Sequence, residues 1–352
     1  MPLASLGVHN NDKLGPILSI TIRDIAAKAG VSFKTVSRVL NNETSVKDAT
    51  KEKVMAIVEE LGYQPNNAAR NLAGNHTYSV GYIYNNPNAY YVIEFQEGLL
   101  KSCHDAGFEL LIHPVKETNE ALAEVVDKLV KRSRIAGLVL TPPFSEDPAT
   151  IEMLTTRKIP FVRVISGQAP ATVEANSVYV DDFEAAKEIG DYIVSLGHTD
   201  IAILSGDEEH ASTQQRVSGF KSALDPHHRA QVLNGEYSFE SGVANMRILI
   251  EEGRVPSAVF ALNDEIAAGA LFAARLYGLQ IPEQLSIAGF EDSPFSRQTW
   301  PRLTTAHQPN HDIARSAGER LVKLICNTDI SNTPTLSFQP ELVKRDSTGI
   351  PS

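Results

Sequence analysis

From Tyr78 onward, short apolar segments alternate with stretches whose apolar residues recur at helical spacing. A first set of segments reads SVGYIY, FELLIH, AGLVLT and PFVRVI, and a second set reads IAILSG, SAVFAL and LSIAGF. Short segments that are apolar throughout are typical of strands buried on both faces of a parallel sheet by the intervening helices. The alternation therefore predicts an α/β architecture.

The number of β–α units exceeds what one compact sheet accommodates, so we expect two doubly wound parallel-sheet subdomains. An oxidoreductase has a similar pattern, but the sequence contains no G-x-G-x-x-G, P-loop or G-x-S-x-G signature. His227 and His228 are adjacent, yet no other pair of residues has the spacing of metal ligands. We therefore expect no metal site, no cofactor and no enzymatic activity.

Residues 21–65 have a different pattern, which predicts three short helices. Gly30 allows a sharp turn after the first helix, and Ser32 is a suitable N-cap for a second helix from Phe33 to about Leu40. The first and third helices are predicted by apolar residues at helical spacing: Ile22, Ile25, Ala26 and Ala29, and then Val54, Ile57, Val58 and Leu61. Two helices joined by a short turn, with a supporting helix, form a helix-turn-helix arrangement.

The outer face of the second helix carries Lys34, Ser37 and Arg38. Arginine binds guanine through two hydrogen bonds, lysine reaches guanine or phosphate, and short hydroxyl side chains suit phosphate contacts. The pattern thus favours DNA binding in the major groove, although the solvated face of any small helical bundle has a similar composition.

The net charge of −11 is unevenly distributed along the chain. Residues 21–74 contain eight Lys or Arg and six Asp or Glu, so this part carries +2 and the remainder −13. A mildly basic head on an acidic body is consistent with nucleic-acid binding by the head alone, and chance variation gives the same asymmetry.

The stretch TIRDIAAKAGVSFKTVSRVLNNETSVKDATKEKVMAIVEELGYQPNNAARNLAG, from Thr21 to Gly74, resembles the DNA-binding head of the lac-repressor family of bacterial regulators without a gap. Its core, VS-x-x-TVSRVLN, is highly specific. Later segments such as LGHTDIAILSG, FALNDEIAAGAL and LSIAGFED also resemble the family. The resemblance implies an all-α helix-turn-helix head with a hinge helix, followed by a periplasmic-binding-protein-like effector domain.

Residues 1–20 read as a disordered tail or as an artefact of start-site choice. The resemblance assigns 21–65 to the DNA-binding domain, 66–76 to the hinge helix and linker, and 77–352 to the effector-binding and dimerisation domain. Within that last domain, subdomain N comprises about 77–179 and 308–335, and subdomain C about 180–307 and 336–352. The chain then crosses between subdomains near Val180, Gln308 and residue 335.

In the head and hinge, the resemblance implies that Phe33, Lys34 and Arg38 read bases and that Leu72 wedges into the minor groove. Phe33 stands where the family often has Tyr, so its contact is expected to be apolar. The full set of residues expected at the DNA is Thr21, Ser32, Phe33, Lys34, Thr35, Ser37, Arg38, Asn41, Asn66, Ala69 and Leu72.

In the effector domain, polar residues that follow strands are expected to line a ligand cleft, because the carboxyl ends of parallel strands face such clefts. The resemblance adds Arg216 and Tyr237. The expected residues are Asn85, Tyr90, Tyr91, Arg216, Tyr237, Asn263, Asp264, Glu291 and Gln308. Strand-end turns and helix caps have similar compositions, and Asp264 in particular suits a helix cap. Glu291 stands where the family usually has Asp, and Ile165 and Ser166 where it commonly has an acid or Gly.

These features predict a homodimeric repressor of carbohydrate-utilisation genes that binds a pseudo-palindromic DNA operator and is released by a small sugar. The C-terminal PELVKRDSTGIPS has no heptads, so no tetramerisation tail is expected. One alternative is a co-repressed regulator that responds to a nucleobase or another small metabolite. A second alternative is a small-molecule binding protein without DNA binding.

The sequence favours a cytoplasmic, nucleoid-associated protein. Cys103 and Cys326 cannot make a disulfide framework, and no apolar run approaches the ~20 residues that span a membrane. The first twenty residues lack the basic and apolar regions of a signal peptide.

Overall fold

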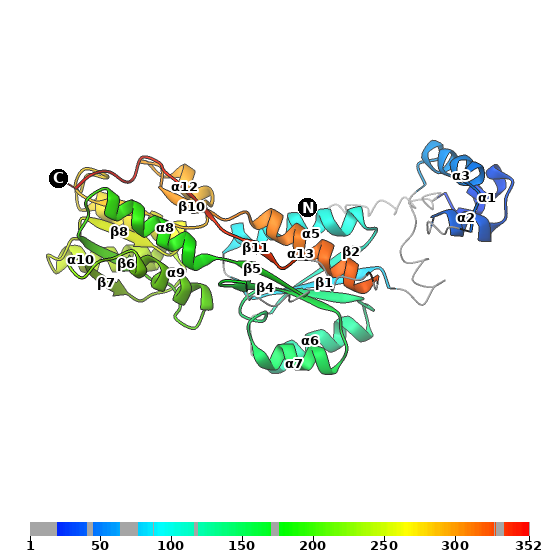
Figure 1. Ribbon diagram of the computed structural model, residues 1–352, viewed down its shortest axis with the longest axis horizontal. Coiled ribbons are helices and arrows are strands. Elements are labelled where there is room, and N and C mark those ends of the chain that lie inside the picture. Colours follow the sequence, from blue (N-terminus) through cyan, green and yellow to red (C-terminus); the bar gives the residue numbers. More distant parts are fainter. Residues whose placement is uncertain are drawn as a thin grey trace, which may run out of the picture. The chain divides into compact units, whose positions relative to one another are not determined.

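The computed structural model describes residues 20–40, 45–63, 77–86, 88–115, 119–169, 176–326, 328 and 334–351. Contacts divide the chain into two compact units, Met1–Ala73 and Gly74–Ser352, and each is described by itself (Figure 1). The predictions for residues 1–19, Asn41, Asn66, Ala69 and Leu72 lie outside the described residues.

The described residues of the first unit form three helices, α1 (Ile22–Ala29), α2 (Phe33–Leu40) and α3 (Asp48–Glu60). They pack around one apolar core made of Ile25, Ala26, Ala29, Val36, Val39, Val54 and Ile57. Gly30 ends α1 in the left-handed region with φ 64°, where a side chain is disfavoured. Ser32 caps α2, since its Oγ accepts a hydrogen bond from the Thr35 backbone N–H at 3.1 Å.

The second unit is built on two parallel sheets. The first is a six-stranded sheet, and its order is β11-β5-β4-β3-β1-β2. Its strands are β1 (Ser79–Tyr84), β2 (Glu109–Pro114), β3 (Gly137–Leu140), β4 (Phe161–Ser166), β5 (Ser177–Val180) and β11 (Leu336–Phe338). The second is a four-stranded sheet of order β7-β6-β8-β9, made of β6 (Asp200–Leu204), β7 (Arg229–Leu233), β8 (Ala258–Ala261) and β9 (Ser286–Ala288).

Helices cover both faces of each sheet, as the apolar strands require (Figure 1). On the first sheet, α5 (Ala89–Asp105) and α13 (Asn310–Ile325) pack on one face, and α6 (Asn119–Lys131) and α7 (Pro148–Thr156) on the other. The helices of the second sheet are α8 (Asp182–Ser195) with α9 (Ala211–Ser222), and α10 (Phe239–Glu251) with α11 (Asp264–Leu276). We call these two parts the N-subdomain and the C-subdomain. The predicted pair of doubly wound parallel-sheet subdomains is confirmed.

The chain passes between the subdomains three times. It leaves the first sheet after β5 to enter α8, and it returns at Gln308, between β10 (Thr305–His307) and α13. β11 pairs in parallel with β5, whereas β12 (Glu341–Val343) pairs antiparallel with β10. The third crossing therefore lies after Phe338, later than the boundary near residue 335 that the sequence predicted. Strand pairing with β5 holds Leu336–Phe338 in the N-subdomain.

Within the described residues, no helix combines the length and the apolar character needed to cross a bilayer.

The packing of α5 against α13 generates a stability prediction. A Cβ atom at Gly98 would collide with the carbonyl oxygen of His311 and lie 2.9 Å from the Cβ of Ala314. Because a helix backbone cannot yield as a side chain does, Gly98→Ala is expected to lower the free energy of unfolding by about 1–3 kcal/mol. Urea unfolding followed by circular dichroism measures the change.

Glu97→Ala is the matched control, because Glu97 is the exposed neighbour of Gly98 on α5. It is expected to change stability by less than about 0.5 kcal/mol. Equal stability of the two variants would contradict this account of the α5–α13 contact.

Candidate functional site

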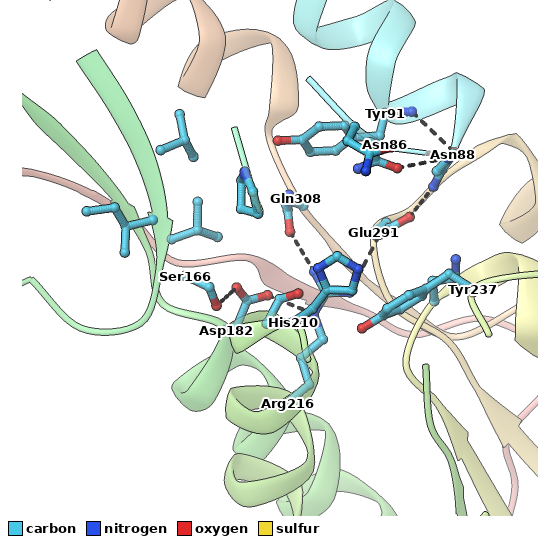
Figure 2. Close-up of a pocket in the computed structure, with 17 residues that line it drawn as sticks. Asn86, Asn88, Tyr91, Ser166, Asp182, His210, Arg216, Tyr237, Glu291 and Gln308 are labelled. Carbon is cyan, nitrogen blue, oxygen red and sulfur yellow. Dashed lines mark hydrogen bonds and ion pairs between the residues drawn. The ribbon is translucent and has the colours of Figure 1, made fainter. Parts of the chain in front are cut away.

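A cavity lies between the two subdomains, at the carboxyl ends of strands from both sheets (Figure 2). This is where open parallel sheets bind ligands, because the loops that follow the strands converge there. The described residues that line it are Asn85, Asn86, Asn88, Tyr91, Pro142, Val164, Ile165, Ser166, Val180, Asp182, His210, Ser212, Arg216, Tyr237, Asn263, Glu291 and Gln308.

Arg216, on α9, is the central cation of the cavity and is only 4% exposed. Its Nε donates to Asp182 Oδ1 at 2.7 Å and its Nη1 to the Leu262 carbonyl at 2.8 Å. Its Nη2 donates to Gln308 Oε1 at 3.3 Å. The guanidinium carbon lies 3.9 Å from the centre of the Phe290 ring, a cation–π distance. Arg216 is thus held by protein partners on every side.

Asp182, the first residue of α8, neutralises Arg216 and is itself buried. Its second oxygen accepts a hydrogen bond from Ser166 Oγ at the end of β4. Burial disfavours the charged form of Arg216, but Asp182, Tyr237 and Glu291 together outweigh it and keep the pKa of the guanidinium above its usual value. Arg216 therefore stays charged, and its ion pair with Asp182 joins α8 to α9.

Glu291 follows β9 and reaches across the cavity to the N-subdomain. Its Oε2 accepts a hydrogen bond from Asn88 Nδ2 at 2.7 Å, and its Oε1 lies 3.5 Å from Arg216 Nη1 (Figure 2). Burial raises the pKa of this carboxyl to about 7, even though Arg216 opposes the shift. The backbone φ angles of Glu291 (99°) and Asp292 (56°) are both positive, a region that favours glycine.

Asn88 is the N-cap of α5, and this role fixes the direction of its amide. Its Oδ1 accepts from the backbone N–H groups of Tyr90 and Tyr91, so its Nδ2 is left to point at Glu291. The carboxylate of Glu291 also lies at the N-terminus of α5, where the helix dipole favours negative charge.

Two tyrosines supply apolar surface with a polar end. Burial raises the pKa of Tyr91 well above its usual value, and it also raises the pKa of Tyr237. The hydroxyl of Tyr237 forms a 2.7 Å hydrogen bond with Thr213 Oγ1. Both rings therefore remain neutral hydrogen-bonding groups at neutral pH.

In the first unit, the face of α2 that was predicted to read DNA is accessible. Phe33 is 51% exposed and Lys34 is exposed, whereas Ser37 and Arg38 are partly buried. The hydroxyls of Ser32 and Thr35 lie 2.9 Å apart, and Thr21 bonds Asp24 Oδ2 through both its backbone N–H and its hydroxyl. Thr21 and Ser32 thus stand at the N-terminal caps of α1 and α2.

Two family models match the chain. Residues 21–66 match the model described as bacterial regulatory proteins, lacI family, and residues 191–348 match a periplasmic binding protein-like domain. The probable HTH-type transcriptional repressor ExuR of Bacillus subtilis (strain 168) is 32% identical, over 93% of this chain and 98% of that protein. The chain belongs to the lacI family.

Solved structures agree with this membership. A lac repressor dimer bound to operator and the anti-inducer ONPF is 27% identical, with a TM-score of 0.73 over 94% of this chain and 99% of its own. A complex of the transcriptional regulator CelR with cellobiose is 25% identical, with a TM-score of 0.65 over 93% of this chain and 99% of its own. The predicted family and its fold are thereby confirmed. The protein is a DNA-binding transcriptional repressor, a class without enzymatic activity.

The cavity gathers most of the effector residues that the sequence predicted. Those that line it are Asn85, Tyr91, Arg216, Tyr237, Asn263, Glu291 and Gln308. Ile165 and Ser166, the departures from the family pattern, line it too. The structure does not place Tyr90 or Asp264 among the lining residues.

Tyr90 and Asp264 have other surroundings. Tyr90 is 37% exposed, and its ring meets Phe295 edge-on at 5.7 Å. Asp264 is fully buried at the start of α11 and accepts hydrogen bonds from the Ser293 N–H and Thr305 Oγ1, both at 2.6 Å. Burial raises its pKa to about 8. Asn263, rather than Asp264, caps α11, and its Oδ1 accepts from the Ile266 N–H at 2.8 Å.

The sequence did not predict Asn88, Asp182, His210 or Ser212 as cavity residues. Asp182 had a usable signal, because it comes two residues after the apolar segment SVYV and thus at a strand end. Asn88 precedes the helix of Tyr90 and Tyr91 and was recognisable only as a cap.

The adjacent His227 and His228 lie outside the cavity. Together with Asp225 they bring potential ligand atoms within 4.8 Å of one another, on a largely exposed turn after α9. His228 Nδ1 accepts a hydrogen bond from the Asp225 N–H at 3.1 Å, so one of its nitrogens already has a role in the turn.

The buried Arg216–Asp182 pair generates a stability prediction. Asp182→Ala removes the nearer counter-ion of a buried guanidinium and leaves only Glu291 at 3.5 Å, so it is expected to cost about 3–5 kcal/mol of unfolding free energy. The double variant Asp182→Ala with Arg216→Met removes the stranded charge and is expected to recover a large part of that loss. Chemical denaturation of both variants measures the difference.

Asp181→Ala is the matched control. Asp181 caps α8 through the Glu184 N–H at 3.1 Å, so its loss is expected to cost only about 1 kcal/mol. A double variant less stable than Asp182→Ala would contradict the stranded-charge explanation.

Proposed function

We propose that this repressor binds a pseudo-palindromic operator as a homodimer and is released from it by a small sugar or sugar derivative. The observation that carries the proposal is the composition of the cavity. Its lining combines planar amides, carboxylates and hydroxyls with the rings of Tyr91 and Tyr237. Sugar hydroxyls need paired donors and acceptors, and the apolar faces of a pyranose pack on aromatic rings.

The comparisons support this proposal at two points. The similar regulator CelR was solved with cellobiose, a sugar, and the similar lac repressor was solved as a dimer on its operator. The proposed regulated genes are those of carbohydrate utilisation. A nucleobase or another metabolite that strengthens operator binding is the alternative for the effector.

Exposed apolar side chains support a homodimer. Tyr90, Ile93 and Leu100 recur at helical spacing on α5, and each is more than one third exposed. A groove on the C-subdomain is lined largely by apolar residues of α11 and its neighbours, including Phe239, Ala268, Leu271, Phe272, Leu276 and Phe295. Apolar surface of this kind is uncommon on a monomer. We propose that a second copy of the chain covers both surfaces.

We propose that Phe33, Lys34 and Arg38 of α2 contact base edges in the major groove, with Thr21, Ser32, Thr35 and Ser37 near the phosphates. The N-terminal end of a recognition helix approaches the bases in helix-turn-helix proteins. Leu72, with Asn66 and Ala69, remains the proposed minor-groove contact of the hinge.

Arg38→Ala tests the proposed DNA face. It is expected to weaken operator binding by about 1–3 kcal/mol and to relax specificity at one base pair per half-site, because a bidentate contact is lost. Lys53→Ala is the control, since Lys53 is an exposed cation on α3. It is expected to affect all DNA sequences alike. Fluorescence anisotropy with operator and scrambled duplexes measures both, and unchanged specificity of Arg38→Ala would exclude the proposed contact.

The allosteric part of the proposal follows from linkage. The cavity lies between the subdomains, so a ligand that binds there alters their relative position, and the N-subdomain follows the hinge segment directly in the sequence. The sugar and the operator are expected to weaken each other's binding by the same factor, corresponding to about 1–3 kcal/mol.

Titration of labelled operator with and without saturating sugar, and of sugar with and without operator, measures both sides of this coupling. Tighter operator binding in the presence of the ligand would establish the co-repressed alternative. Equal operator affinity with and without saturating sugar would exclude the proposed coupling.

A further inference from the structure

The charged groups of the cavity are unequally divided between the two signs. Among the described residues that line it, Arg216 is the sole Lys or Arg, whereas Asp182 and Glu291 are both carboxylates. One positive and two negative charges leave the lining with a net charge of −1 when both acids are ionised. His210 is the remaining group that can carry a proton.

The positive charge of Arg216 is already committed to protein partners. Its Nε bonds Asp182, its Nη1 bonds the Leu262 carbonyl and faces Glu291 at 3.5 Å, and its Nη2 bonds Gln308. A ligand anion that approached this guanidinium would compete with two carboxylates for it. Arg216 therefore orients the two acids and is not a free anion-binding group.

The two carboxylates, in contrast, each present an oxygen to the N-subdomain side of the cavity. Asp182 Oδ2 accepts from Ser166 Oγ, and Glu291 Oε2 accepts from Asn88 Nδ2. Both donors are uncharged. A ligand hydroxyl is also an uncharged donor and can take the same place, whereas a carboxylate or phosphate has no proton to donate.

Contacts next to Glu291 hold the backbone turn that carries this residue. Asp292 anchors the turn, because its Oδ1 accepts from Ser296 Oγ at 2.7 Å and from Arg345 Nη2 at 2.6 Å. Phe295 then packs against Tyr90 on α5. Positive φ angles of 99° and 56° are disfavoured for residues with a side chain, so these contacts are needed to hold the turn at Glu291 and Asp292. Within that turn, the Glu291 carboxylate is held by Asn88 and Arg216.

We propose that the cavity selects an uncharged polyhydroxy ligand and excludes the matching sugar acids, with Glu291 as the residue that discriminates. This inference rests on the proposed sugar-responsive function and specifies the chemical class of the sugar. A third negative charge in this buried space would meet like charges and would lose its hydration without gaining a cation. Burial also raises the pKa of Glu291, so the cavity disfavours the ionised form of its own carboxyl group.

The test compares three matched pairs of ligands on the full-length protein by isothermal titration calorimetry, above neutral pH so that Glu291 is ionised. The pairs are D-glucose and D-glucuronate, D-galactose and D-galacturonate, and cellobiose and cellobiouronate. In any pair that binds, we expect the neutral sugar to bind at least about tenfold more tightly than its acid. An acid that binds as tightly as its neutral partner would overturn the inference.

Glu291→Gln tests the discriminating residue, because it keeps the side-chain length and removes the charge. The preference for the neutral sugar is expected to fall by about tenfold in this variant, since a like-charge repulsion is removed. The matched control is Glu240→Gln, the same change at an exposed position on α10 outside the cavity, which is expected to keep the wild-type preference. An unchanged preference in Glu291→Gln would remove Glu291 from this role.

The outcomes separate this inference from the function on which it rests. Tighter binding of an acid overturns the charge selection and leaves a sugar-responsive repressor in place. Failure of all six compounds to bind would overturn the sugar-responsive function, and the inference with it. The comparison of neutral sugars with sugar acids on the wild-type protein decides whether the ligand is uncharged, even if Glu291→Gln fails to fold.

Discussion

The buried ion pair between Arg216 and Asp182 is the interaction on which the cavity depends. Two charges removed from water are tolerated only when each has a partner and its remaining hydrogen-bonding atoms are satisfied. Here the guanidinium is satisfied by a carboxylate, a carbonyl and an amide, and the carboxylate by a serine hydroxyl. Asp182 lies on α8, Leu262 follows β8, Gln308 lies at a crossing between the subdomains, and Ser166 ends β4. The requirement to satisfy one buried charge thus brings distant parts of the chain together.

From this centre, two polar connections lead to α5. One runs from Glu291 to Asn88, the cap of the helix. The other runs from Gln308, whose Nε2 donates to Asn310 Oδ1 at 2.7 Å, and then from Asn310 Nδ2 to Glu94 Oε2 at 3.1 Å. Rearrangement of the cavity therefore changes the hydrogen-bond partners of α5. Because α5 also carries exposed apolar side chains, a surface available for assembly is directly connected to the ligand site.

The head could be predicted from sequence nearly in full within its described residues, for a physical reason. Its helices are set by local signals: apolar residues at helical spacing, the left-handed Gly30 and the capping Ser32. All of these act within a few residues along the chain. The pair of parallel sheets was predictable on similar grounds, because a strand buried on both faces is apolar throughout.

The cavity was only partly predictable, because its geometry depends on contacts between residues far apart in the sequence. A strand-end rule identified Asn85, Asn263 and Glu291. It could not separate Tyr90 from Tyr91, because neighbours on a helix point about 100° apart and only packing decides which one faces the cavity. Nor could it pair Glu291 with Asn88, which are 203 positions apart. The third crossing was predicted a few residues too early, near residue 335, because its position after Phe338 depends on pairing with β5.

The sequence by itself determined the three-helix head, the alternation of strands and helices, and the kinds of chemical group available to a ligand. Periodicity, capping and the end of a strand are properties of short segments, so they can be read from neighbouring residues. The tertiary structure decided that Arg216 is neutralised by Asp182, that Glu291 reaches the cap of α5, and that Asp264 lies beneath the cavity and not in it. Ion pairing and contacts between distant side chains depend on the distances between separate helices and strands, and only the folded chain fixes those distances.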